Sequence, residues 1–265
     1  MKQQEEFYNF NSESYVRRKV EIFNDSFGDY NNDYDCPICR NKGIVMVAYN
    51  DNGNWGTKVR DCDCAKIISA RKNLKNSGLA SIVDEYRFDN FNTDHVWQAK
   101  LKKAAENFAA APEGWFFLGG QSGAGKTHIC TAICDTLLKK GMAVTYCLWR
   151  TESIKIKGHI NDPEIYCELV DNYKKVDVLY VDDLFKLANN SQGPSAADIG
   201  VAFEILNYRY INRLTTIIST EFSIDDIIRF DEAIGGRIAE MAKNHLIVIG
   251  PDRQKNYRLR NVNFV

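Results

Sequence analysis

The stretch that decides the fold is WFFLGGQSGAGKTHICTAICDTLLKK, residues 115–140. It opens with apolar residues typical of a buried strand and ends in a helical pattern, and a glycine-rich loop joins the two. Glycines let the backbone turn tightly enough for successive N–H groups to point at phosphate oxygens, and the following helix adds the positive end of its dipole. The loop matches the pattern G-x-x-x-x-G-K-[ST], which predicts a nucleoside-triphosphate site.

The residue types in this loop each have an expected part in nucleotide binding. We expect Lys126 to bridge the β- and γ-phosphates and the Thr127 hydroxyl to bind Mg²⁺. A purely structural glycine turn is the alternative, but a strand before the loop and a helix after it favour the nucleotide site. The predicted nucleotide-binding residues of the stretch are Gly120, Gln121, Ser122, Gly123, Ala124, Gly125, Lys126, Thr127 and His128.

A second apolar stretch supplies the carboxylates that such a site needs. Residues 177–183 read DVLYVDD, so Asp182 and Asp183 follow four apolar residues at the end of a predicted strand. We expect Asp182 to hold the Mg²⁺ ion and Asp183 to orient or deprotonate the attacking water. Two surface acids at a strand end are the alternative. Because Asp is one methylene shorter than the Glu of many ATPases, we expect slow hydrolysis suited to a switch.

Outward from these motifs, apolar strands alternate with amphipathic helices. This alternation predicts an α/β fold with a mainly parallel sheet covered by helices on both faces. The predicted strands are 115–120, 143–149, 177–183, 215–220 and 245–250. The predicted helices are 98–111, 126–140, 164–174, 196–213 and 223–243.

Four cysteines mark a small module before this core. Cys36 and Cys39 form one close pair and Cys62 and Cys64 another, and between the pairs two short strands flank a turn at 51–53. Four thiolates brought together by a hairpin suit a closed, structural Zn²⁺ site, and the alternatives are buried free thiols or a redox pair. We therefore predict three parts. They are an acidic segment and linker at 1–35 with a short helix at 14–23, a zinc module with a basic helix at 36–80, and the nucleotide-binding domain at 81–265.

Composition limits what the whole chain can be. Its 265 residues carry a net charge of -1, and 45% of them are hydrophobic, which excludes wholesale disorder and an overall basic surface. No apolar run is long enough to span a membrane and the N-terminus lacks the apolar core of a signal peptide, so we expect a cytoplasmic protein without disulfides. The four cysteines outside the pairs are expected to pack in the core: Cys130, Cys134, Cys147 and Cys167.

In the order and spacing of its motifs, the chain resembles the AAA+ ATPases of the DnaC/DnaI type, the loaders of replicative helicase, in their phage or mobile-element branch. IstB-type transposition helpers are close relatives of this family. The resemblance covers about 36–260 and implies an AAA+ core with a reduced lid after a zinc module. The motifs that carry it are GQSGAGKT, DVLYVDDLF, FEILNYRYINRLTTIIST, DEAIGGRI and NYRLR.

The resemblance also implies further site residues. Thr220, or Ser219 beside it, corresponds to the residue that senses the γ-phosphate, although loaders often have Asn where this chain has Glu221. Arg237 corresponds to the arginine that reaches the ATP of a neighbouring subunit, and a surface salt bridge is its alternative. The second sensor is Arg258, with Arg253 as the rival. Phe88 and Phe91 lie where the chain enters the core near the adenine, or simply pack in it.

The implied partners are a replicative hexameric helicase, single-stranded DNA and further copies of the chain in an ATP-dependent assembly. DNA would meet the basic residues that follow the hairpin, unless these form an ordinary solvated face. They are Lys58, Arg60, Lys66, Arg71, Lys72 and Lys75. Two other functions stay open, a transposition helper that selects target DNA and an adaptor that binds nucleotide without hydrolysing it. A small-molecule kinase lacks a visible acceptor site.

Overall fold

The computed structural model describes residues 12–28, 36–65, 85–186 and 193–259. These residues form two compact units, an N-terminal unit and a core unit, which we describe separately. The domain boundary predicted at residue 80 and most of the predicted basic helix lie outside the described residues.

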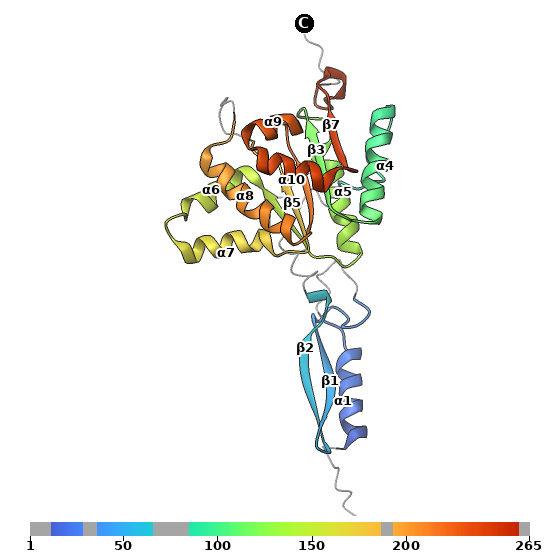
Figure 1. Cartoon of the computed structure of the whole chain (residues 1–265). Coiled ribbons are helices and arrows are strands. Elements are labelled where there is room, and N and C mark those ends of the chain that lie inside the picture. Colours follow the sequence, from blue (N-terminus) through green and yellow to red (C-terminus); the bar gives the residue numbers. More distant parts are fainter. Residues whose placement is uncertain (1–11, 29–35, 66–84, 187–192, 260–265) are drawn as a thin grey trace, which may run out of the picture. The chain divides into compact units, whose positions relative to one another are not determined.

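The N-terminal unit is one helix beside a two-stranded antiparallel hairpin (Figure 1). Helix α1 (Glu13–Asp25) begins where the Ser12 hydroxyl accepts a hydrogen bond from the Tyr15 amide. The strands β1 (Ile44–Asp51) and β2 (Asn54–Asp61) meet at Asn52 and Gly53, which both have positive φ as a tight hairpin turn requires. Near the end of α1, the Asn24 side chain bonds both the N–H and the C=O of Met46, so it covers part of the outer edge of β1.

The core unit is built on a five-stranded parallel sheet in the order β4-β5-β6-β3-β7. This confirms the predicted sheet. Strand β6 lies between β3 and β5, so the two strands that carry the motifs are separated by the strand with the predicted first sensor. The strands are β3 (Trp115–Gly120), β4 (Val144–Leu148), β5 (Val178–Asp182), β6 (Thr215–Ser219) and β7 (Leu246–Ile249).

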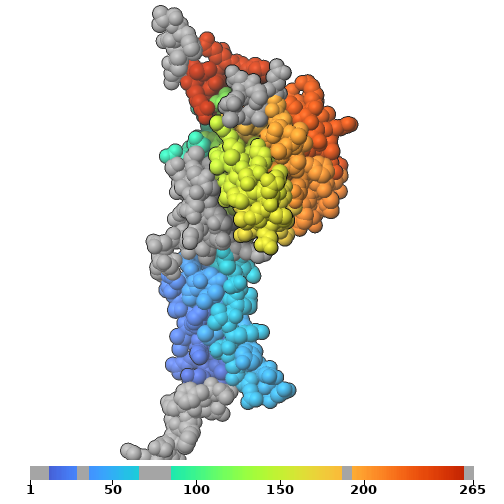
Figure 2. Space-filling view, turned by 90° about the vertical axis from the view of Figure 1, so that its left-hand side faces the viewer, coloured from blue at the N-terminus to red at the C-terminus, as the bar shows by residue number. Residues whose placement is uncertain are grey.

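Helices cover both faces of this sheet because its side chains alternate between two apolar clusters (Figure 1). Phe116 and Leu118 of β3 pack with α4 (Val96–Ala110) and α5 (Lys126–Lys139). Trp115 and Phe117 belong to the cluster on the other face. That face carries α6 (Trp149–Gly158), α7 (Pro163–Lys174), α8 (Ala196–Ile211), α9 (Ile224–Phe230) and α10 (Glu232–Ala242). In the space-filling view, α6 and α7 (yellow) adjoin the orange residues of α8 and the helices after it (Figure 2).

A buried arginine ties the second face to the sheet. Arg209 of α8 is fully buried, and its guanidinium donates to the Thr216 hydroxyl at 2.9 Å and to several backbone carbonyls. Two of these are the carbonyls of Val176 at 2.8 Å, two residues before β5, and of Thr215 at 2.5 Å, at the start of β6. The carbonyls satisfy a charge that would otherwise be costly to bury.

Three details of the core unit differ from the predictions. The helix predicted at 223–243 is two helices, because Asp231 is extended, ends α9 and caps α10 by accepting from the Ile234 amide at 2.7 Å. Helix α6 was not predicted, since it follows β4 without an intervening turn residue. Cys167 is exposed, so core packing does not account for it. None of the helices in the described part of the chain is long and apolar enough to cross a membrane.

Candidate functional site

The carboxyl ends of the strands open onto a cavity of about 430 Å³. It lies at the edge of the sheet where β3 runs into the glycine loop and where Asp183 follows β5. In open parallel sheets this edge is the usual ligand site. The cavity is lined by Tyr86, Asn90, Phe91, Asn92, Ser122, Gly123, Gly125, Lys126, Thr127, His128, Asp183, Lys186, Glu221, Tyr257 and Arg258.

The glycine loop has the backbone that a phosphate cradle needs. Gly120, Gly123 and Gly125 have φ of 125°, 76° and 83°, a region that side chains rarely allow, and Gly125 is the N-cap of α5. Lys126 is 6% exposed, and its ammonium donates to the carbonyls of Gly120 at 2.8 Å and Gln121 at 2.9 Å. Burial lowers the pKa of Lys126 from its ordinary value. The lysine therefore sits inside the loop, curled over the loop's own carbonyls.

Asp182 is a buried carboxylate with several donors around it. It is 4% exposed and accepts from the hydroxyls of Tyr146 at 3.0 Å and Ser219. The Thr127 hydroxyl lies 3.4 Å from both of its carboxylate oxygens. Adjacent ligands of an octahedral Mg²⁺ ion lie about 3.0 Å apart, so the Thr127 and Asp182 oxygens fit neighbouring positions around one such ion.

Asp183 turns out of the strand toward the cavity. Its φ is 54°, and its amide donates to the Ser219 hydroxyl at 3.2 Å. Its carboxylate pairs with the ammonium of Lys186 at 2.8 Å, and the same ammonium lies 3.1 Å from the Glu221 carboxylate. Sequence reasoning missed Lys186. Only its spacing, three residues after an acid that follows a buried strand, gave any signal of it.

The predicted first sensor does not face the cavity. Thr220 is fully buried, its hydroxyl donates to the Leu184 carbonyl at 2.7 Å, and it accepts from the Phe222 amide at 3.2 Å. The Ser219 hydroxyl is directed to Asp182 instead. Glu221 is the side chain from this strand end that lines the cavity.

The chain after β7 folds back onto the glycine loop. The Gln121 amide bonds both the carbonyl and the N–H of Asp252, at 2.6 and 2.7 Å, which anchors the short 3₁₀ helix η2 (Arg253–Lys255) beside the loop. The Tyr257 amide donates to the Gly123 carbonyl at 2.9 Å. Arg258 lines the cavity with its guanidinium 3.5 Å from the Ser122 hydroxyl, whereas Arg253 is not among the lining residues.

The opposite end of the cavity is aromatic. His128 stacks on Tyr86 with ring centroids 4.6 Å apart, and Phe91 meets the histidine ring edge-on at 5.2 Å. Burial lowers the pKa of His128, so the ring is neutral near pH 7, with Nε2 hydrogen-bonded to the Arg87 carbonyl. Phe91 lines the cavity, while Phe88 packs against the core cluster. A flat, neutral, aromatic end next to a phosphate loop suits a nucleobase.

Arg237 lies on α10 and is not a lining residue of this cavity. Its guanidinium donates to the side chain of Asn207 at 3.0 Å and to the carbonyl of Ala233 at 2.8 Å, and it lies over the Phe203 ring at 5.0 Å. The residue is half-buried. Its predicted action on a neighbouring subunit stays a prediction.

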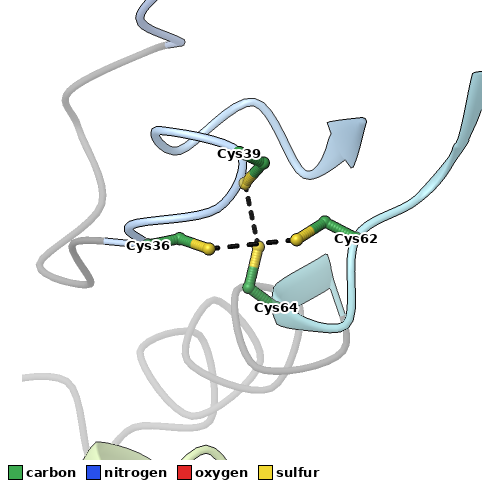
Figure 3. Close-up of side chains that lie close together, drawn as sticks. All are labelled: Cys36, Cys39, Cys62 and Cys64. Carbon is green, nitrogen blue, oxygen red and sulfur yellow. Dashed lines mark hydrogen bonds between the residues drawn. The ribbon is translucent and has the colours of Figure 1, made fainter. Parts of the chain in front are cut away.

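The N-terminal unit holds the second candidate site. Cys36, Cys39, Cys62 and Cys64 are buried, and their sulfur atoms all lie within 4.8 Å of one another. Figure 3 shows the two pairs pointing toward a common centre, one from the turn before β1 and the other from the residues after β2. Sulfurs around a tetrahedral Zn²⁺ ion lie about 3.8 Å apart. The Cys36 and Cys62 sulfurs are 3.9 Å apart, and those of Cys39 and Cys64 are closer, at 3.1 Å.

The turn around the first pair is shaped to present its sulfurs. Arg40 and Asn41 have left-handed backbones with φ of 48° and 68°, and the Asn41 side chain accepts from the Cys36 amide at 2.9 Å. The Gly43 amide donates to the Cys39 sulfur at 3.3 Å. Although burial raises it, hydrogen bonds from Cys64 and Gly43 bring the pKa of the Cys39 thiol down to about 7. The donor set fits a zinc ion held by four thiolates.

A protein-family profile matches most of the core unit. The profile described as the bacterial DnaA ATPase domain matches residues 82–240, more than half of the chain. The match includes the glycine loop, Asp182, Asp183 and Arg237.

Individual relatives extend the likeness to the N-terminal unit. The phage-like element PBSX protein XkdC of Bacillus subtilis (strain 168) is 31% identical over 86% of this chain and 88% of its own length. The replicative helicase loader DnaC of Buchnera aphidicola subsp. Schizaphis graminum (strain Sg) is 26% identical over 45% of this chain and 50% of its own length. Among solved structures, the crystal structure of the DnaC helicase loader has a TM-score of 0.52 at 21% identity, covering 64% of this chain and 98% of that one.

Proposed function

Since this chain belongs to the family of the bacterial DnaA ATPase domain, we propose that it is a DnaC-like loader of phage type, which binds ATP with Mg²⁺ and loads a replicative hexameric helicase onto DNA. Membership of this family gives it an AAA+ core of the kind used in DNA replication. The specific loading role and the use of hydrolysis as a switch are the proposal.

The observation that carries the proposal is the convergence of four side chains at the glycine loop. Lys126, Thr127 and Asp183 line the cavity, and the buried Asp182 carboxylate at the end of β5 lies 3.4 Å from the Thr127 hydroxyl. Lys126 would leave the loop carbonyls for the β- and γ-phosphates, and Thr127 and Asp182 would hold Mg²⁺, which neutralises phosphate charge when bound. The base would lie against the aromatic cluster of Tyr86, Phe91 and His128, and Arg258 would contact the same nucleotide from the folded-back segment.

Hydrolysis would depend on Asp183. Its carboxylate faces the cavity and would orient the attacking water. In the present geometry this carboxylate is held by Lys186. A short carboxylate that must first leave an ion pair supports slow turnover, as a switch requires.

Arg237 supports assembly rather than binding within one chain. It lies outside the cavity of its own chain, on a surface formed with α8. We propose that it reaches the terminal phosphate of ATP in a neighbouring copy, where an arginine can accelerate phosphoryl transfer by about 10³-fold or more.

The N-terminal unit would be held together by Zn²⁺ on its four cysteines and would contact the helicase or DNA. Its hairpin carries Lys58 and Arg60 as exposed side chains, and Tyr49 is 44% exposed on the facing strand. Exposed cations with an aromatic ring suit single-stranded DNA, which binds through phosphate charge and base stacking. The other basic residues predicted for this contact, Lys66, Arg71, Lys72 and Lys75, lie outside the described residues.

The experiment is ATP hydrolysis by the purified full chain, alone and with single-stranded DNA and the replicative helicase of the same host. We expect slow turnover that the partners raise. Lys126→Ala should remove nucleotide binding, whereas Asp183→Asn should keep binding and lose turnover. The control is Lys175→Met, because Lys175 pairs with Asp171 at 2.7 Å on the surface of α7. Turnover that stays unchanged in Asp183→Asn would contradict the assigned roles.

A further inference from the structure

The phosphate end of the cavity contains a lysine that none of the motifs includes. The Lys186 ammonium donates to the Asp183 carboxylate at 2.8 Å and lies 3.1 Å from the Glu221 carboxylate. All three side chains line the cavity together with Lys126. Lys186 therefore bridges the acid that is proposed to hold the attacking water and a second acid from the end of β6.

The fold fixes the backbone from which Lys186 projects. Asp183 and Phe185 both have left-handed backbones, with φ of 54° and 62°. The turn between them is tied to the end of β6, because the Leu184 amide donates to the Ser219 carbonyl at 2.9 Å and the Leu184 carbonyl accepts from Thr220 at 2.7 Å. Two unfavourable backbones persist only where the surroundings hold them. The turn therefore directs the Lys186 side chain toward the cavity.

Glu221 makes this lysine necessary. A carboxylate that lines a phosphate site repels the triphosphate, and Lys186 is the cation that lies against it. The ammonium also has a reason to move. A terminal phosphate beside Asp183 offers it a stronger anionic partner than either carboxylate, since a terminal phosphate carries close to two negative charges and a carboxylate carries one.

We propose that Lys186 senses the terminal phosphate of ATP. Without nucleotide it holds Asp183 and Glu221, and with ATP it turns to the γ-phosphate and leaves Asp183 for the attacking water. ADP ends one phosphate short and leaves the lysine on the two carboxylates. The inference rests on the proposed nucleotide site, and adds to it the residue through which ATP is distinguished from ADP.

The test is the affinity of the full chain for a non-hydrolysable ATP analogue and for ADP, each with Mg²⁺, measured by titration calorimetry. Lys186→Met should weaken the analogue by about tenfold or more and ADP by less than about twofold. Lys186→Arg should keep most of the preference for the analogue. Glu221→Gln should strengthen the analogue relative to ADP, because the competing carboxylate is gone. Lys175→Met, with its surface lysine, should change neither affinity.

Several outcomes would overturn the inference. Equal losses for both nucleotides in Lys186→Met would mark a structural role, and unchanged affinities for both would mark no role in binding. If Lys186→Met failed to fold, a Glu221→Gln variant with an unchanged ratio would still refute the proposal. Failure of the wild type to bind either nucleotide would remove the proposed function as well, whereas normal binding with an insensitive ratio removes only the role of Lys186.

Discussion

Because Gly123 has no Cβ atom, the glycine loop can pack closely against the segment that follows β7. The φ of Gly123 is 76°, and a Cβ atom built there would fall on the side-chain oxygen of Asn256, in the segment that folds back after β7. The Tyr257 amide donates to the Gly123 carbonyl at 2.9 Å, and Arg258 follows directly. Gly123 stands at a position where the phosphate-loop pattern allows any residue. Here the packing of the C-terminal segment requires glycine.

We predict that Gly123→Ala lowers nucleotide affinity by about tenfold or more and destabilises the core unit by about 1–3 kcal/mol. The added methyl group must displace Asn256 and strain the backbone at the same time. Calorimetric titration with MgATP and chemical denaturation measure the two effects. Gly158→Ala is the control, since nothing lies within 4 Å of a Cβ at that position. Equal behaviour of the two variants would refute the account of the C-terminal segment.

Residue positions in the site were predictable where a strand end sets them. Lys126, Thr127, Asp182 and Asp183 could be inferred from two local patterns, because parallel strands bring their carboxyl ends to one edge. In the structure, three of them line the cavity and Asp182 lies behind Thr127. The directions of the Thr220 and Lys186 side chains could not be inferred in this way. They depend on the left-handed turn at Asp183, and a pattern of residue types does not encode that turn.

At the scale of elements, the contact between α9 and α10 depends on one glycine. A Cβ atom at Gly235 would lie 2.5 Å from Ile228 Cγ1 and 2.8 Å from Ile228 Cα, so the second helix packs directly on the backbone of the first. At the adjacent Gly236 nothing lies within 4 Å. Two neighbouring glycines in one helix thus differ completely in what they do.

This difference gives a matched pair of variants. Gly235→Ala should cost about 1–3 kcal/mol in the free energy of unfolding, because the helices must separate. Gly236→Ala should gain about 0.5–1 kcal/mol, because alanine favours the helix. Chemical denaturation of the full chain measures both. A loss in Gly236→Ala as large as that in Gly235→Ala would show that helix packing is not the cause.

The same region shows why element boundaries were harder to predict than element types. Apolar periodicity runs through 223–243, and its two glycines lie inside the second helix rather than at the boundary, so only the cap formed by Asp231 divides the segment. Helix α6 begins at Trp149, directly after the last residue of β4, and its apolar start was assigned to the strand. Caps made by single side chains depend on backbone geometry that periodicity does not contain.

At the scale of the whole molecule, the chain consists of two units, and we expect a different ligand to stabilise each, Zn²⁺ the N-terminal unit and MgATP the core unit. The N-terminal unit has a small core, in which one buried cluster consists of the four cysteines and Val45. Small modules of this kind fold largely on their metal. The core unit instead has two large apolar clusters on the faces of its sheet. The fold class was predictable from sequence because each unit has a local sequence pattern. The N-terminal unit has the spacing of its cysteines, and the core unit has the alternation of strands and helices.

We predict about one Zn²⁺ ion per full chain and two independent thermal transitions. A zinc chelator should abolish the transition of the N-terminal unit, while MgATP should raise only that of the core unit. Cys64→Ser should lose the metal. Cys167→Ser is the control, because its thiol is exposed and remote in sequence from the cluster. Metal analysis and scanning calorimetry make the test, and a zinc-free chain with an unchanged first transition would contradict the metal assignment.

The central claim is that nucleotide in this cavity controls loading of a helicase, and the most direct test is loading itself. The measurement is unwinding by the purified host helicase on single-stranded DNA that carries no free end, with the full chain and ATP added. We expect the wild-type chain to support loading and the Lys126→Ala and Asp183→Asn variants not to support it. Loading by both variants at the wild-type level would contradict the claim.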